Sequence, residues 1–284
     1  MRNVCRFSLK KLVETRVNFM NKVLVLLILL VGATVTWAEN GVIKRNLSPS
    51  EYGRVVINNH SQQAGMPPVV FDHWSHRNKY TCRLCHLDFG FSMVANATKF
   101  HAADNANGIF CGTCHNGKMM MDGNIIFPAC TKEYTSEEYK VCVQCHQLAP
   151  NTIQEKRFTS FVKNMPSEKF GNGINWEKAE REGKFKPIDH IEGVSATRTK
   201  MKVLDDMIIK SKLEGMPNVI FSHRKHVGGG GCKLCHPGLF SINKGHSVYS
   251  MDGIFEGKSC GACHNTVAFP LTDCRRCHTE PAGA

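Results

Sequence analysis

Apolar residues are scattered along most of this chain, and the longest continuous apolar run lies near the N-terminus. It spans Val23–Val31, follows Lys22 and is succeeded by small residues that end at Ala38. A basic residue, an apolar core and a small-residue region are together typical of a secretory signal peptide. The run is too short for a confident membrane span, and an uncleaved anchor is the alternative. We therefore expect residues 1–38 to be a signal peptide and the protein to be exported.

The segment before Met20 is long for the basic region of a signal peptide. Met20 is therefore a candidate for the true start of the chain, and Cys5 would then lie outside the protein. No cysteine stands near the cleavage region, so we do not expect a lipoprotein anchor.

Further along, two short apolar stretches each precede a His-x-x-His pair. Val69–Phe71 and its counterpart at residues 219–221 predict short extended strands. The i, i+3 spacing of each histidine pair places both rings on one face of a helix. Asp72 and Ser222 stand directly before these pairs and are suitable N-cap residues. A strand followed by a short helix is therefore predicted twice.

Two further helices are predicted between these stretches. One lies around Trp176–Gly183 and is ended by Gly183 and Pro187. The other lies at about Thr199–Leu213, where apolar residues form a loose helical stripe: Met201, Leu204, Ile208 and Leu213. We interpret this stripe as a face that packs against the C-terminal part of the chain rather than as a docking face for a partner.

Cysteine content narrows the class of protein, because fourteen cysteines are many for 284 residues. Twelve of them fall into six C-x-x-C-H motifs, which leaves only Cys5 and Cys130. Zinc sites and redox dithiols also use C-x-x-C, but neither requires a His directly after the second Cys in every copy. C-x-x-C-H is the attachment signature of c-type haem. We therefore predict six haem c groups, bound covalently by Cys82, Cys85, Cys111, Cys114, Cys142, Cys145, Cys232, Cys235, Cys260, Cys263, Cys274 and Cys277.

The chain also repeats itself, because F-x-H-x-x-H followed by C-x-x-C-H begins at Phe71 and again at Phe221. We expect each of these phenylalanines to be the main packing contact of its histidine helix. The repeat divides the chain into an N-terminal arm (39–64), a first three-haem module (65–147), a linker (148–214), a second three-haem module (215–278) and a tail (279–284). Extra residues at 131–141 and 256–259 leave every haem motif intact, and we predict surface loops there.

Modules this short cannot bury an ordinary apolar core, so the haems themselves must form it. The predicted fold is mainly α-helical and irregular with little secondary structure. It consists of two tandem haem-cored three-haem modules joined by a partly helical linker, and each C-x-x-C-H lies on a helical turn.

Histidine usage predicts the iron ligands. After the six motif histidines are assigned, eight of the fourteen histidines remain, and six of these match between the two copies of the repeat. That is three per module for three haems per module, so we predict two histidine ligands for every iron. The predicted ligands are the motif residues His86, His115, His146, His236, His264 and His278, together with the matched residues His73, His76, His101, His223, His226 and His246.

Other candidate ligands are weaker. His60 and His190 have no counterpart in the other module, and we interpret both as surface histidines. Methionine is the alternative ligand type, and it would raise the potential of a haem. Met66 and Met216 repeat, and Met119–Met121 lies beside the second motif. Methionine more often fills packing gaps around cofactors, and the matched histidines suffice.

Cys130 stands outside the motifs and is replaced by Thr272 in the second module. We expect a partly buried thiol there. An exposed odd cysteine would instead be able to cross-link chains.

The order F-x-H-x-x-H, C-x-x-C-H, lone His, C-x-x-C-H and C-x-x-C-H resembles the three-haem branch of the class III multihaem cytochromes c, the cytochrome c-seven type. The resemblance covers both modules but neither the arm nor the linker. It implies these ligand pairs: His73 with His86, His76 with His115, His101 with His146, His223 with His236, His226 with His264, and His246 with His278. The chain departs from the family in the long gap from His115 to Cys142 and in the linker.

The formal net charge of +12 overstates how basic the mature protein is. Residues 1–38 contain six basic residues and one acidic residue, and haem propionates would add negative charge. We therefore expect no nucleic-acid partner.

Iron with two imidazole ligands has no open coordination site, so the predicted function is electron transfer by low-potential haems rather than catalysis. Expected partners are other redox proteins: cytochromes, an inner-membrane quinol oxidoreductase or outer-membrane cytochromes. Tandem modules of this kind resemble proteins of metal-reducing anaerobic bacteria, which implies anaerobic respiration or extracellular electron transfer. The periplasm is the expected location, with the cell surface as an alternative.

Two other function classes stay open. A multihaem nitrite or sulfite reductase would need one haem with an open face. A polymeric filament or an outer-membrane conduit would use these modules structurally, with His60 as a ligand between subunits.

Overall fold

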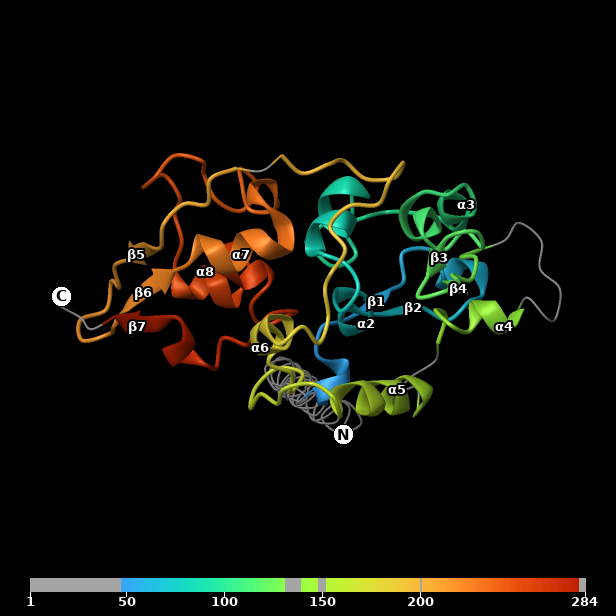
Figure 1. Ribbon diagram of the computed structural model, residues 1–284, viewed down its shortest axis with the longest axis horizontal. Helices are drawn as coiled ribbons and strands as arrows, with labels where there is room; N and C mark the ends of the chain where they lie inside the picture. The colour runs from blue at the N-terminus through green and yellow to red at the C-terminus, as the bar shows by residue number, and fades with distance from the viewer. Residues whose placement is uncertain (1–46, 131–138, 148–151, 200, 281–284) are drawn as a thin grey trace, which may run out of the picture. The chain divides into compact units, whose positions relative to one another are not determined.

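The computed structural model describes residues 47–130, 139–147, 152–199 and 201–280 (Figure 1). The predicted signal peptide with Met20 and Cys5, and most of the predicted loop at 131–141, lie outside these residues. In the described ranges, no helix is both long enough and apolar enough to cross a membrane.

Regular structure is short throughout the described ranges. The α-helices are α2 (His73–Arg77), α3 (Ala102–Ala106), α4 (Tyr139–Cys142), α5 (Thr152–Val162), α6 (Trp176–Arg181), α7 (His223–Gly230) and α8 (Met251–Phe255). The strands are β1 (Arg54–Ile57), β2 (Val69–Asp72), β3 (Met120–Met121), β4 (Asn124–Ile125), β5 (Met207–Ile209), β6 (Asn218–Phe221) and β7 (His278–Glu280). Single turns of 3-10 or π-helix are η1 (Pro49–Glu51), η2 (Gln62–Ala64), η3 (Leu84–Asp88), η4 (Phe110–Thr113), η5 (Cys232–Leu234), η6 (Ser259–Ala262) and η7 (Cys274–Arg276). The predicted fold class, with little regular structure, is confirmed.

Each histidine helix directly follows a strand of a small antiparallel sheet. In the first module β2 pairs with β1, and Phe71 lies opposite Val55. In the second module β6 is the central strand between β5 and β7, and Phe221 lies opposite Met207. The predicted strands before both histidine helices are therefore confirmed, and the pairing fixes the start of each helix.

The sheets change three expectations. The helix predicted at Thr199–Leu213 is wrong: β5 forms there instead, and its burial alternates with period two, which suits an edge strand. The open edge of β6 supplies backbone partners that local helix propensity does not. Similarly, the predicted N-terminal arm is not wholly irregular, because it contains β1. Thr279 and Glu280, expected in a loose tail, end β7.

The N-cap positions of the two histidine helices are as predicted, but neither Asp72 nor Ser222 caps with its side chain. Asp72 is 5% exposed, and its two carboxylate oxygens accept from Arg54 Nε at 2.7 Å and Nη2 at 3.3 Å. The carboxylate therefore ties β2 to β1 rather than binding the free amides of α2. A two-pronged contact of this kind is among the stronger charged hydrogen bonds.

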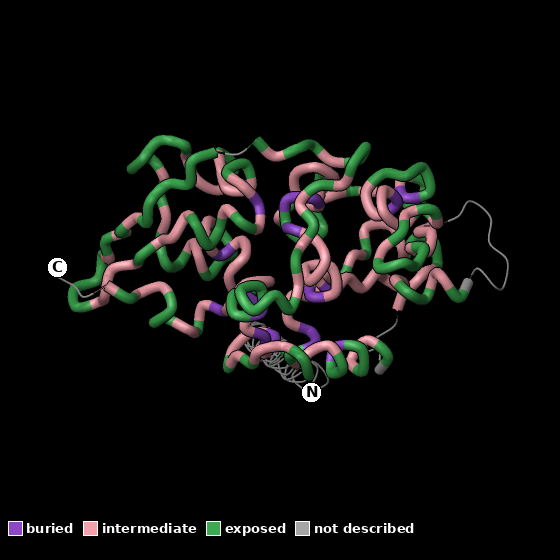
Figure 2. The backbone as a smooth tube through the Cα atoms, viewed as in Figure 1, coloured by how far each residue is buried: buried purple, intermediate pink, exposed green. Residues whose placement is uncertain are grey.

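An apolar cluster lies where the linker packs on the first module. Trp74 from α2, Phe158 from α5, and Ile174 and Trp176 at the start of α6 are all buried, and they contact one another. Helix α6 was predicted, whereas α5 was not. Buried positions are sparse along the rest of the described backbone (Figure 2), in keeping with the prediction that haems rather than side chains fill the centre of each module.

Candidate haem-binding sites

Each described C-x-x-C-H motif folds as a tight turn. The backbone N–H of the motif histidine donates to the carbonyl of the first cysteine in four motifs: His115 to Cys111 at 2.8 Å, His146 to Cys142 at 2.8 Å, His236 to Cys232 at 3.0 Å, and His264 to Cys260 at 3.0 Å. This i, i+4 bond is one helical turn, as predicted, and it brings the ends of the motif together. None of the thirteen described cysteines is in a disulfide, which leaves both motif sulfurs available for thioethers.

Hydrogen bonds to backbone carbonyls fix the ring orientation of the motif histidines. Nδ1 of every motif histidine lies within hydrogen-bond distance of a backbone carbonyl: His86 to Phe91 at 2.9 Å, His115 to Phe127 at 3.2 Å, His146 to Pro67 at 2.6 Å, His236 to Phe240 at 2.9 Å, His264 to Phe269 at 3.2 Å, and His278 to Pro217 at 2.7 Å. A carbonyl can only accept, so Nδ1 carries the proton and Nε2 is the bare nitrogen. Metal-binding histidines are oriented in this way.

The predicted distal histidines are held similarly. His73 Nδ1 lies 2.6 Å from the Gly53 carbonyl, His223 Nδ1 lies 3.2 Å from the Asp205 carbonyl, and His226 Nδ1 lies 2.8 Å from the Ser222 carbonyl. His76 Nδ1 is 3.0 Å from the Ser75 hydroxyl. The repeated Gly-Met-Pro points to the carbonyls of Pro67 and Pro217 as matched contacts, whereas no repeat or motif marks the carbonyls of Gly53 and Asp205.

Three histidine pairs face each other at the separation that one metal ion requires. An imidazole nitrogen binds a first-row transition metal at about 2 Å, and the ring centre lies roughly 1 Å behind it, so two rings across one ion have centroids about 6 Å apart. The centroid separations are 6.4 Å for His73 and His86, 6.3 Å for His76 and His115, and 6.2 Å for His226 and His264. These side chains therefore fit an iron held by two histidines.

The structure does not bring the other three predicted pairs into ring contact. No such contact among the described residues joins His101 to His146, His223 to His236, or His246 to His278. Their assignment stays a prediction. The three pairs that do meet are combinations that the cytochrome c-seven resemblance implies.

Phe71 contacts both histidines of its helix, as expected. Its ring centroid lies 4.9 Å from that of His73 and 4.6 Å from that of His76. Phe221 repeats this geometry, at 5.0 Å from His223 and 4.5 Å from His226. The same aromatic contact therefore sets the two ring positions in both modules.

Burial favours the neutral form of several groups at these sites. It lowers the pKa of His73, His86, His115 and His264, and together with nearby His115 it lowers the pKa of His76 to about 4. Neutral imidazole is the form that binds metal. Burial also raises the pKa of the Cys85, Cys111 and Cys263 thiols to about 12.

His60 differs from its prediction. Its ring stacks on His101 at 3.7 Å between centroids, and its Nε2 is buried without a hydrogen-bond partner among the residues that the structure describes. It is therefore not a plain surface histidine, and the lack of a repeat partner gave no signal of this contact. His190 is exposed as expected, with Nδ1 3.2 Å from the Ser195 hydroxyl. Cys130 is partly buried, as expected, and its sulfur lies 3.9 Å from Asn105 Nδ2.

A family model described as cytochrome c7 and related cytochrome c matches residues 69–158 and 219–279, more than half of the chain. The chain belongs to this cytochrome c7 family. The two matched ranges contain all six C-x-x-C-H motifs, and the unmatched residues between them are most of the linker. The cytochrome is therefore a multihaem c-type electron carrier built from tandem modules.

Solved structures with likeness to the cytochrome include a c7-type three-heme cytochrome domain, with 36% identity over 28% of this chain and 99% of that one, at a TM-score of 0.25. The C-terminal hexaheme fragment of GSU1996 is 22% identical over 80% of this chain and 97% of the fragment, at a TM-score of 0.23. The dodecaheme cytochrome c GSU1996 is 21% identical over 77% and 73% of the two chains, at 0.25. With TM-scores this low, the family assignment rests on the sequence match alone. No curated protein matches the cytochrome.

Proposed function

We propose that this cytochrome is an exported electron carrier with six covalently bound haems c, each iron held by two histidines. The observation that carries the proposal is the set of three facing imidazole pairs, 6.2–6.4 Å apart, each with one member in a C-x-x-C-H motif. The same motif and the same rear hydrogen bond to Nδ1 occur six times, which supports six equivalent attachment sites.

The haem supplies the one-electron chemistry, and the protein residues set the conditions under which it works. The twelve motif cysteines would hold the porphyrins, and Nε2 of each facing histidine would hold the iron. No coordination site would then be left for a substrate, and electrons would pass by outer-sphere transfer. Ligation by two imidazoles, without methionine, supports low reduction potentials.

The side chains around the ligands have their own roles. The backbone carbonyls behind Nδ1 orient the rings and increase the basicity of the ligating nitrogen. Phe71 and Phe221 pack against the histidine pairs and would hold their rings in place. Because the protein offers few buried apolar side chains, haem binding would also supply most of the folding free energy of each module.

The proposed partners are other redox proteins, on both the donating and the accepting side: cytochromes, an inner-membrane quinol oxidoreductase or outer-membrane cytochromes. We propose the periplasm as the site of action, with a role in anaerobic respiration or extracellular electron transfer. The apolar run at Val23–Val31 supports export.

A redox titration of the purified holoprotein, followed by electron paramagnetic resonance, tests this function. The expected result is six haems per chain, low-spin ferric signals only, and reversible reduction at low potential. Stoichiometric binding of carbon monoxide to the reduced protein would reveal an open iron and favour a reductase. Light scattering that shows large particles would favour a filament over a monomeric carrier.

A further inference from the structure

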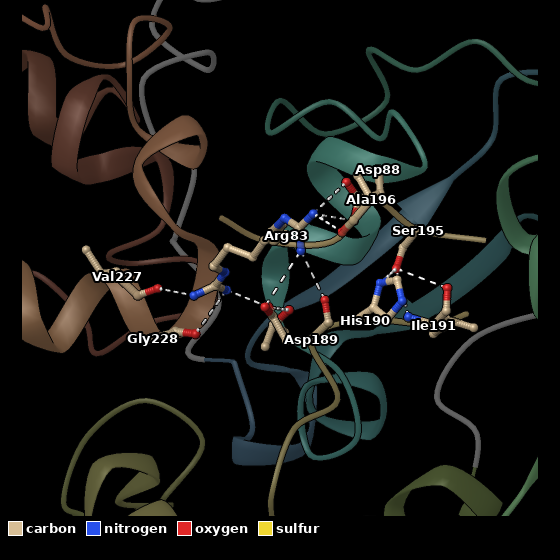
Figure 3. A network of polar contacts seen from close by, with 11 residues as sticks. Arg83, Asp88, Asp189, His190, Ile191, Ser195, Ala196, Val227 and Gly228 are labelled. Carbon is tan, nitrogen blue, oxygen red and sulfur yellow. Dashed lines mark hydrogen bonds and ion pairs between the residues drawn. The ribbon is translucent and has the colours of Figure 1, made fainter. Parts of the chain in front are cut away.

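A network of charged side chains connects the first C-x-x-C-H motif to the linker (Figure 3). Arg83 stands between the two cysteines of that motif and is only 7% exposed. Its Nη1 donates to the Asp189 carbonyl at 3.1 Å, and its Nη2 donates to the Ala196 carbonyl at 2.5 Å and to Asp88 Oδ1 at 3.3 Å. Thioether formation does not require an arginine at this place. Arg83 therefore binds the linker to the motif from a buried position.

The linker also runs along the chain that enters this motif. Thr81 N–H donates to the Ile188 carbonyl at 3.1 Å, and Ile188 N–H donates to the Lys79 carbonyl at 2.8 Å. The Thr81 hydroxyl donates to Asp189 Oδ1 at 2.8 Å. Backbone and side-chain bonds thus fix Asp189 beside the first haem motif.

Arg198, which also lies in the linker, connects Asp189 to the second module. Its Nη2 lies 2.5 Å from Asp189 Oδ1, and its Nη1 donates to the Val227 carbonyl of α7 at 3.0 Å. Nη2 also reaches the Gly228 carbonyl at 3.5 Å. A cation at the carboxyl end of a helix is favourably placed against its exposed carbonyls. The Asp189 carboxylate therefore lies between two guanidinium groups, that of Arg83 in the first haem motif and that of Arg198 in the linker.

A glycine-rich part of α7 lies close to the first haem motif. Gly228–Gly231 precede Cys232, whereas the matching residues of the first module, Asn78–Thr81, include no glycine. Glycine in a helix costs about 1 kcal/mol per residue relative to alanine, so helix formation does not explain this run. A Cβ on Gly229 would lie 3.7 Å from Cys82 Sγ, a sulfur of the first haem motif. That is an ordinary van der Waals distance, so α7 at Gly229 lies within one side chain of the sulfur.

A second contact joins the first module to the second. Arg77, the last residue of α2, donates from Nη1 to the Val267 carbonyl at 2.8 Å, and Val267 follows the motif residue His264. The Tyr52 hydroxyl donates to the Ala268 carbonyl at 2.5 Å. The surroundings of the facing pairs His73–His86 and His226–His264 therefore touch each other.

We propose that Arg83, Asp189 and Arg198 are positioning residues that hold the first haem of the module at 65–147 against α7, so that electrons cross between the modules through this haem. The inference rests on the proposed electron-transfer function. In the crossing, the ferrous iron of this haem loses one electron and becomes ferric, and a ferric iron of the second module gains that electron and becomes ferrous. No bond forms or breaks, and no proton moves.

The test compares full-length, haem-loaded variants. Asp189→Asn removes the shared charge at constant shape, Arg198→Gln removes the bonds to α7, and Gly229→Leu adds a side chain toward Cys82. Lys225→Gln is a matched control, because it breaks an exposed ion pair of 3.1 Å with Glu177 that also joins the linker to α7. Arg224→Leu is the control for Gly229→Leu, since Arg224 is an exposed residue of the same helix.

Two readouts are needed. Small-angle X-ray scattering measures the separation of the modules without any electron transfer. Pulse reduction followed by optical spectroscopy measures how fast the haems re-equilibrate their electrons. We expect Asp189→Asn, Arg198→Gln and Gly229→Leu to increase the radius of gyration and to lose the fastest inter-haem phase, while both controls match the wild type.

Each outcome has a separate meaning. If the wild type takes up electrons reversibly and the three variants retain both its scattering and its fast phase, the positioning role is wrong. If the modules separate but the fast phase persists, the crossing does not use this haem. If the wild type itself shows no reversible uptake, the proposed function fails whatever the variants do.

Discussion

The imidazole rings of His73 and His86 are within 7° of parallel, with centroids 6.4 Å apart. The next pair, His76 and His115, is turned by 54°, and His226 and His264 are turned by 62°. The first haem site therefore differs from the other two in the relative rotation of its ligands, although all three have the same chemistry.

This rotation predicts distinct ferric signals in electron paramagnetic resonance. Parallel imidazole planes separate the iron d orbitals that carry the unpaired electron and give a rhombic low-spin spectrum. Strongly rotated planes bring those orbitals close in energy and give a spectrum dominated by one large g value. We expect both kinds of signal in the oxidised protein. His73→Ala should abolish a rhombic component and leave the large-g components, and loss of a large-g component instead would contradict the pairing.

A second prediction is that the two histidines of helix α2 bind different haems. His76 faces His115, whereas His73 faces His86, so His76→Ala should open the second haem and leave the first intact. The reduced variant is expected to bind one carbon monoxide per chain, which optical spectroscopy measures. His226→Ala is the matched variant and should do the same at the haem of His264. Disturbance of the parallel His73–His86 signal by His76→Ala would show that the pairing is wrong.

The stacked rings of His60 and His101 give a third prediction. The two ring centroids are 3.7 Å apart, but only His101 has a counterpart in the second module. We therefore expect His101 to be the ligand of the third haem. His101→Ala should leave that iron open to carbon monoxide, while His60→Ala should keep every haem closed. The reverse result would make His60 the ligand and His101 its support.

Much of this site could be predicted from the sequence, because haem attachment depends on local spacing. The C-x-x-C-H turns and the H-x-x-H helices need only a few adjacent residues, and both formed where the pattern placed them. The Phe71 and Phe221 contacts followed from the repeat alone.

Features that depend on distant partners could not be predicted in this way. The stripe at Thr199–Leu213 suggests a helix, but Met207–Ile209 pairs with β6, which begins several residues later. Asp72 is a good cap by type, yet Arg54 takes its carboxylate. Nothing local shows that Arg83 contacts Asp189, because more than one hundred positions separate them.

The apolar cluster around Trp74 gives the last prediction, which concerns stability. Trp74 is 8% exposed and lies 5.3 Å from Phe158 and 5.2 Å from Phe161 between ring centroids. The matching residue of the second module is the exposed Arg224, so this contact belongs only to the first module and its linker. Trp74→Ala should lower the free energy of unfolding by about 3–5 kcal/mol, the usual cost of truncating a buried aromatic residue.

Denaturant unfolding of the holoprotein, followed by far-ultraviolet circular dichroism, measures this loss. Trp74→Phe should cost less than Trp74→Ala, since it keeps an aromatic ring and removes an indole N–H that is buried without a partner. Arg224→Ala is the control, and its exposed position predicts a change within about 0.5 kcal/mol. An equally small effect of Trp74→Ala would mean that the linker does not stabilise the first module, and that the haems alone hold α2 in place.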